Sequence, residues 1–301
     1  MTRIRSGDSS MIDDRRGGGG GFGGFGGFGG LGGLGGLPIP IRAGGGMLGV
    51  IVLLASLLLP RLLNGGQSAA SIPQQQTGTG VSSAGSCNSD LEQIVCGATV
   101  DVQNFWQANL PKFYGVNYEM TKTVFFTDAT STGCGQASSQ TGPFYCPIDH
   151  EVYIDLGFMQ ALETQLIGKP TDLAEQYIVA HEYGHHIQNL VGINDQVQKA
   201  QQNDPGRANQ YSVALELQAD CFAGIWVGDA ASRGLLDSPN EINEALNAAA
   251  GVGDDRIQQK TQGRIDKEAW THGSAEQRQT WFTRGYNSGD PKQCDTFSEV
   301  L

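Results

Sequence analysis

The spacing of hydrophobic positions divides the chain into regions of different character. Between residues 17 and 37 one apolar side chain recurs at every third position among glycines, at Phe22, Phe25, Phe28, Leu31, Leu34 and Leu37. Such a segment loses too much backbone entropy to fold alone, and a collagen helix would have one glycine in three together with many prolines. The pattern predicts a disordered Gly-rich tail over residues 1–42.

An uncharged and mostly apolar run follows from Ala43 to Pro60 and is eighteen residues long. As a helix it would cover about 27 Å, close to the roughly 30 Å of a hydrocarbon core. We therefore predict a transmembrane helix over residues 43–63 and a flexible linker over residues 64–86. The alternative is a buried helix of a soluble domain, but the flanking segments offer nothing against which to bury it.

Basic residues are concentrated before this run. Arg3, Arg5, Arg15, Arg16 and Arg42 precede it, and only Arg61 follows closely. This asymmetry predicts a single-pass protein of the cell membrane, with a cytoplasmic N-terminus and an extracytoplasmic catalytic domain. The alternative is a signal peptide cleaved near the small residues 68–70, but the region before the apolar run is longer than in such peptides, which favours an uncleaved anchor.

All the cysteines lie after the apolar run, at Cys87, Cys96, Cys134, Cys146, Cys221 and Cys294. None is in a Cys-x-x-Cys pair, so disulfides in an oxidising compartment are favoured over a thiolate zinc site. Pairs between Cys87 and Cys96 and between Cys134 and Cys146 are locally plausible, which would leave Cys221 for Cys294. The sequence alone does not select one connectivity.

Residues 87–301 have the size of one domain with its own core. Two segments rich in β-branched and aromatic residues, 121–128 and 151–158, are typical of strands. The Gly- and Ser-rich stretch 129–150 between them is expected to be a loop that a Cys134 to Cys146 bridge would pin.

Helical patterns dominate after residue 160. The first predicted helix, within 170–192, has Asp172 as its N-cap and Gly192 as its stop, and a second covers 209–234. Polar helices are expected within 238–290. The fold class is therefore α+β, helix-rich with a small sheet.

The part of the chain from Gln67 onward is acidic. It carries 13 basic and 28 acidic residues, a net charge of −15. Nucleic acids and anionic lipid surfaces need basic patches, so this balance argues against both as partners of the domain.

The first predicted helix contains the pattern H-E-x-x-H at His181, Glu182 and His185. Residues four apart lie one turn above each other, so both imidazoles can reach one metal ion, and Glu182 can reach a water molecule bound to it. His186 is about 100° away from His185 around the helix and cannot share the ion. We expect His186 to lie on the outer face and His150 to lie at the surface.

A catalytic zinc uses three protein ligands, so a third is needed. The second predicted helix contains Glu216 and, one turn later, Asp220. An ordinary solvated acidic face is the alternative, but the surroundings are apolar, and two acids one turn apart would repel each other there without a cation. We predict that Glu216 is a ligand and that Asp220 accepts the spare N–H of His181 or His185.

These motifs carry a family resemblance. H-E-x-x-H followed by E-x-x-x-D resembles the gluzincin metallopeptidases, and the phrases "VAHEYGHHIQN", "ELQADCFAGIW" and "THGSAEQRQTWFTRGYNSGDPKQCDTF" are similar to the bacterial putative neutral zinc metallopeptidase family, over roughly residues 87–298. The resemblance implies a zincin-like domain and a zinc-dependent endopeptidase. It also implies one Zn²⁺ per chain held by His181, His185 and Glu216, with Glu182 as general base.

Two further roles follow from the expected chemistry. An oxyanion needs a second electrophile, for which His272 is the first candidate and Tyr211 and Arg278 are the next. The predicted strand at residues 152–155 could receive an extended peptide by edge pairing. Because such pairing contacts the peptide backbone and not the side chains, it predicts a broad choice of substrate sequences.

The leading hypothesis is therefore a membrane-anchored zinc endopeptidase that hydrolyses peptides or proteins with a zinc-activated water and a glutamate base. The alternative is a catalytically silent, zinc-stabilised binding module of the envelope. An intramembrane protease is disfavoured, because the motif lies about 120 residues beyond the apolar run.

Overall fold

A computed structural model describes residues 2–16, 86–162, 164, 171–238 and 241–300. The predicted transmembrane helix at 43–63, the linker at 64–85 and residues 17–42 of the predicted tail lie outside the described residues. None of the helices in the described ranges is both long enough and apolar enough to cross a membrane.

The described part of the chain contains a four-stranded sheet in the order β1-β2-β6-β5 and a separate hairpin. Its strands are β1 (Ile12–Asp14), β2 (Thr123–Phe125), β6 (Glu151–Ile154) and β5 (Phe144–Cys146), and the hairpin pairs β3 (Ala129–Thr132) with β4 (Gly135–Ser138). β1, β2 and β6 are parallel, whereas β5 is antiparallel to β6.

Two expectations about this region are wrong. The stretch 129–150 is not a loop, because it forms β3, β4 and β5. The strand at 152–155 is not an edge, because β6 has β2 on one side and β5 on the other. Its hydrogen bonds are therefore used within the sheet, and the sheet ends at β1 and β5.

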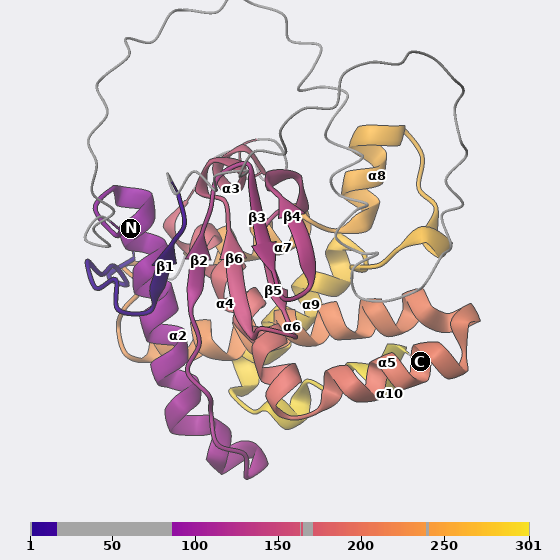
Figure 1. Cartoon of the computed structure of the whole chain (residues 1–301). Helices are drawn as coiled ribbons and strands as arrows, with labels where there is room; N and C mark the ends of the chain where they lie inside the picture. Colours follow the sequence, from indigo (N-terminus) through magenta and orange to yellow (C-terminus); the bar gives the residue numbers. More distant parts are fainter. Residues whose placement is uncertain (1, 17–85, 163, 165–170, 239–240, 301) are drawn as a thin grey trace, which may run out of the picture.

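Helices account for most of the domain, and two of them, at Asp172–Leu190 and Ala208–Ser232, follow the predicted bounds closely. The helices are α2 (Asp90–Tyr114), α3 (Leu156–Leu162), α4 (Asp172–Leu190), α5 (Ile193–Asn203), α6 (Ala208–Ser232), α7 (Ile242–Gly251), α8 (Asp254–Gln262), α9 (Ala275–Ser288) and α10 (Thr296–Val300). Figure 1 shows their arrangement around the sheet. The helix α4 begins at Asp172 with Thr171 as its N-cap, one residue before the expected cap.

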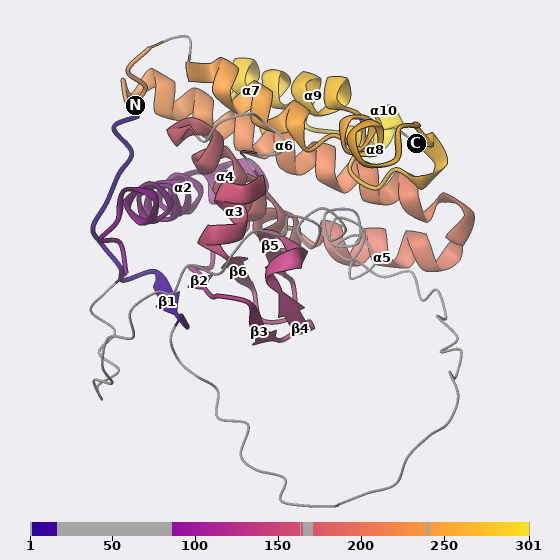
Figure 2. The same cartoon turned by 90° about the horizontal axis from the view of Figure 1, so that it is seen from above.

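Seen from above, the elements form layers (Figure 2). The strands lie on one side, α2 and α4 lie in the middle, and α6, α7 and α9 form the opposite side, in agreement with the contacts that α4 makes to α2, β5 and α6. The helix α4 is thus covered on both sides. A helix in this position has no solvent-facing side along its middle.

The helix α2 has a clear local signal. The Ser89 hydroxyl accepts from the Glu92 N–H while the Glu92 carboxylate reaches back to the N-cap, which is a capping box. The helix ends at Gly115, whose φ of 69° suits a glycine. Its buried stripe, which includes Val102, Trp106 and Leu110, packs in the main core.

Three disulfides join the pairs favoured by the sequence, Cys87–Cys96, Cys134–Cys146 and Cys221–Cys294. The third links α6 to the segment just before α10. Close by, α6 and α9 approach so tightly that a Cβ on Gly285 would lie 1.9 Å from the Cys221 carbonyl oxygen.

The N-terminal segment, residues 2–16, belongs to the domain. It supplies β1, and Ile4 is only 5% exposed within the core. The prediction of a disordered tail is therefore wrong for residues 2–16, because these residues find partners on the sheet, on α2, on α4 and on the turn after α6, all far away in the sequence.

Candidate metal centre

Close packing of two helices creates the site. Gly184 of α4 lies against α6, where an added Cβ would be 3.0 Å from the Ala219 Cα atom and carbonyl oxygen. A larger residue at this position would push the helices apart. The small pair Gly184 and Ala219 thus lets side chains one turn away on the two helices meet.

Three ligand atoms converge in the gap. The Nε2 atoms of His181 and His185 lie 3.1 Å and 3.5 Å from the two carboxylate oxygens of Glu216. One ligand atom from each residue lies within 4.8 Å of the other two. The site therefore brings together the three predicted ligands, two from α4 and one from α6.

The other nitrogen of each imidazole faces away from this centre and meets an acceptor. The His181 Nδ1 atom is 2.9 Å from Asp220 Oδ1, and the His185 Nδ1 atom is 2.8 Å from Gln188 Oε1. Acceptors at both Nδ1 atoms favour the tautomer with hydrogen on Nδ1, which leaves both Nε2 lone pairs directed at the centre. Gln188, which sequence reasoning missed, follows His185 by three residues.

These donors fit Zn²⁺. Two neutral imidazoles and one carboxylate match a catalytic zinc site that keeps a fourth position open. Burial alone raises the pKa of Glu216, but with no metal bound the charges of protonated His272 and His185 and a hydrogen bond from protonated His181 outweigh burial, so the pKa lies well below its ordinary value. The Glu216 carboxylate is therefore ionised, as a ligand requires.

Asp220 is the centre of a buried network beneath the site. Its carboxylate is fully buried and accepts from the Tyr177 hydroxyl at 2.5 Å and from Arg278 Nε and Nη2 at 2.7 Å and 2.8 Å. Burial alone would raise the pKa of Asp220, but Arg278 and His181 lower it below the ordinary value. Arg278 is thus paired with Asp220 beneath His181.

Glu182 lies next to the ligands and is 7% exposed. Burial raises its pKa above the ordinary value, against the opposing effect of His181 and His185. A carboxylate with a raised pKa is a stronger base than an exposed one.

His272 is held beside the site by Asp254, the first residue of α8. One Asp254 oxygen accepts from the backbone N–H groups of Thr271, His272 and Gly273, at 2.7, 2.6 and 3.0 Å. The other oxygen lies 3.3 Å from His272 Nδ1. Burial lowers the pKa of His272, but Glu216 and Asp254 raise it above the ordinary value.

The expected positions of His150, Tyr211 and His186 compare with the structure as follows. The His150 side chain is 42% exposed, in keeping with a surface position, and Tyr211 is half-buried under Arg207 at the start of α6. The outer-face prediction for His186 is wrong, because this residue is fully buried. Its Nε2 atom is 2.7 Å from the Glu119 carbonyl oxygen and its Nδ1 atom is 3.1 Å from the Tyr145 hydroxyl.

Fold and site together define a protein that can hold a divalent metal ion between two packed helices. The chain belongs to the putative neutral zinc metallopeptidase family, whose model matches residues 1–297. The match supports a zinc peptidase at the level of the family, with zinc as the metal and peptides or proteins as substrates.

Two bacterial relatives illustrate the similarity. The uncharacterized protein YpfJ of Escherichia coli K12 is 40% identical over 258 residues, which cover 85% of this chain and 88% of the relative. The uncharacterized protein Rv2575 of Mycobacterium tuberculosis is 49% identical over 214 residues, which cover 68% of this chain and 69% of the relative. No solved structure matches the chain.

Proposed function

We propose that the chain is a zinc-dependent endopeptidase in which His181, His185 and Glu216 hold the metal and Glu182 is the general base. The observation that carries the proposal is the convergence of three ligand atoms, with both imidazole Nδ1 atoms engaged by acceptors. This arrangement orients the free lone pairs toward one point, as a metal site needs.

The chain's own residues divide the work of hydrolysis. A bound Zn²⁺ supplies Lewis acidity, which polarises the peptide carbonyl and makes water more acidic. Glu182 accepts a proton from the attacking water as its oxygen bonds to the carbonyl carbon. Glu182 then gives that proton to the amide nitrogen as the C–N bond breaks, so the same carboxylate acts first as base and then as acid.

His272 is our candidate for stabilising the negative charge on the carbonyl oxygen. Three backbone N–H groups fix its loop to Asp254, and the bond from Nδ1 to Asp254 supports a protonated ring whose Nε2–H can donate. A donor held in this way needs little reorganisation during the reaction. Asp254 is then a positioning residue, since it acts through His272.

Substrate binding is proposed at β5 in place of the strand first expected. β5 is an end strand of the sheet, and it packs against α4, where the Tyr145 hydroxyl meets His186. An extended peptide added to this edge would be held by its backbone, which predicts a broad choice of sequences.

We also propose that the domain works outside the cytoplasm and that residues 43–63 attach it to the cell membrane. The three disulfides support an oxidising compartment. The uncharged and mostly apolar run from Ala43 to Pro60 supports the attachment through its hydrophobic surface.

The test combines metal analysis with cleavage of casein, using the purified full chain. Wild type should contain one zinc and cleave casein. Glu182→Gln should keep the zinc but lose at least about 100-fold in rate, because the general base is absent. His185→Asn should lose both zinc and activity, whereas the matched change His150→Asn, at a half-exposed histidine, should lose neither.

One outcome would contradict the hypothesis that the chain is an enzyme. If wild type binds one zinc per chain yet cleaves neither casein nor a mixed peptide library, the chain is a silent zinc-stabilised binding module. If wild type binds no zinc, both hypotheses fail.

A further inference from the structure

The N-terminal segment (residues 2–16) is bound to the catalytic domain along its whole length. Ile12, Asp13 and Asp14 pair in parallel with Thr123, Val124 and Phe125 of β2. Before the strand, Arg3 N–H donates to the Leu235 carbonyl at 2.9 Å and Ser6 N–H donates to the Gln93 carbonyl at 3.0 Å. Its backbone thus bonds to β2, to α2 and to the turn after α6.

Four arginines that suggested a cytoplasmic N-terminus are engaged in ion pairs on this domain. The pairs are Arg3 with Asp237 at 3.1 Å, Arg5 with Asp172 at 2.8 Å, Arg15 with Glu151 at 2.9 Å and Arg16 with Glu92 at 2.5 Å. Their acidic partners come from four separate parts of the fold. Asp172 is the first residue of α4, so one pair reaches the helix that carries the metal ligands.

Two features of the domain require the segment. The side-chain amide of Gln176 in α4 is fully buried, and its Nε2 donates to the Thr2 hydroxyl and to the Ile4 carbonyl, both at 2.7 Å. Removing the segment would leave that amide without these acceptors. On α2, Gly97 leaves space for the segment, because a Cβ there would lie 2.7 Å from Arg5 Cα and from the Ile4 carbonyl oxygen.

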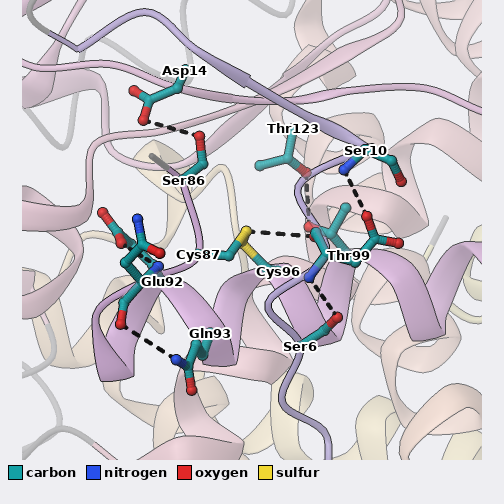
Figure 3. Close-up of a disulfide and its surroundings, with 12 residues drawn as sticks. Ser6, Ser10, Asp14, Ser86, Cys87, Glu92, Gln93, Cys96, Thr99 and Thr123 are labelled. Atoms are coloured by element: carbon teal, nitrogen blue, oxygen red, sulfur yellow. Dashed lines mark hydrogen bonds between the residues drawn. A yellow bond between two sulfur atoms is a disulfide. The ribbon is translucent and has the colours of Figure 1, made fainter. Parts of the chain in front are cut away.

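The end of the segment and the start of the domain also meet. The Ser86 hydroxyl donates to Asp14 at 3.1 Å, beside the Cys87–Cys96 disulfide (Figure 3). Residues 14 and 86, on either side of the undescribed residues 17–85, therefore lie in contact.

We propose that residues 2–16 are a permanent part of the catalytic domain and lie on the same side of the membrane as the metal site. A strand that pairs in a sheet cannot be separated from that sheet by a bilayer. Residues 16 and 86 then lie on one side of the membrane, which excludes a single crossing between them. This replaces the expected single crossing with a cytoplasmic N-terminus. The same conclusion holds if a second copy supplies the segment.

Accessibility of single cysteines tests the topology in the full chain. All six native cysteines are in disulfides, so an introduced cysteine is the only free thiol. Gly7→Cys reports on the segment, since nothing lies within 4 Å of the added Cβ, and Gln198→Cys reports on an exposed position of α5. Both are labelled in intact spheroplasts with a membrane-impermeant maleimide and again after lysis.

Equal labelling of the two positions, or equal protection until lysis, supports the proposal. Protection of Gly7→Cys with labelling of Gln198→Cys, or the reverse, overturns it. The result is independent of catalysis. Labelling of neither position before lysis would place the whole domain in the cytoplasm. This result would contradict the proposed extracytoplasmic location, but it would still support the proposal that residues 2–16 and the metal site lie on the same side of the membrane.

A substitution under the segment tests the packing in the full chain. Gly97→Ala should lower the midpoint of urea unfolding, because the new methyl group collides with the backbone of Ile4 and Arg5. The control is Asn104→Ala, an exposed position on the same helix, where a better helix former should leave the midpoint unchanged or raise it. If Gly97→Ala raises the midpoint as the control does, no backbone lies over that glycine and the proposal is wrong.

Discussion

The buried carboxylate of Asp220 gives the sharpest test of the network beneath the metal site. Asp220 accepts from Tyr177, His181 and, twice, Arg278, and its side chain is fully buried while that of Arg278 is 3% exposed. In Asp220→Asn one acceptor oxygen becomes an NH₂ group. A donor then faces donors, and the Arg278 charge loses its counter-charge.

The substitution should change both the free energy of unfolding and the affinity for zinc. Breaking a buried ion pair by removing one partner costs about 3–5 kcal/mol in the free energy of unfolding. Loss of the carboxylate that orients a ligating histidine lowers metal affinity by about 10–100-fold. We therefore expect Asp220→Asn to unfold at much lower urea concentration in the presence of a chelator, and to bind zinc more weakly in a competition titration.

The control is Asp229→Asn on the same helix. Asp229 pairs with Arg233 at 2.6 Å, but these side chains are 33% and 39% exposed, so the loss should be below about 1 kcal/mol. If Asp220→Asn costs no more than this control and binds zinc as tightly as wild type, the network does not support the metal site.

Three other expectations concern separate features. Burial lowers the pKa of His186 to about 4, below the roughly 6.5 of an unfolded histidine. Its contribution of about 3 kcal/mol is thus complete above pH 6.5 and lost as the pH falls toward 4. His186→Gln should flatten this part of a plot of urea midpoint against pH, and an unchanged slope would refute the assignment. The double change Cys221→Ser and Cys294→Ser should cost about 4 kcal/mol in urea unfolding, because the bridge closes a loop of 73 residues; a cost below about 1 kcal/mol would disagree. Asp254→Asn and His272→Ala should each lower kcat for casein by about 100-fold at unchanged zinc content, and the positioning role fails if only His272→Ala does so.

Residue spacing within single helices was enough to predict much of the metal centre. An α-helix fixes the direction of each side chain, so His181 and His185 had to share a face, and so did Glu216 and Asp220. The apolar residues around the two acids indicated that they were buried. The three disulfide pairs also followed the sequence, because two of them join cysteines only 9 and 12 residues apart.

The surroundings of His186 and of the strand at 152–155 were predicted wrongly, because they depend on which helices and strands pack against the helix or strand in question. His186 points away from the metal ligands, which in a surface helix would mean solvent. In this fold α4 lies between the sheet and α6, so the same direction leads to a buried position under β5. The same limit applies to the edge strand, since a run of β-forming residues does not reveal which neighbours will pair with it.

The sequence by itself determined the H-E-x-x-H helix, the second acidic helix and the helix-rich character of the domain, because these depend on contacts within a few residues. Only the tertiary structure decided that Asp254 orients His272, that β5 is an edge, and that residues 2–16 complete the sheet. These arrangements join residues that are brought together by packing, as with Arg5 and Asp172, which are 167 positions apart. Composition and periodicity carry no information about such a meeting, since the partner is selected by the shape and charge of a surface that exists only after folding.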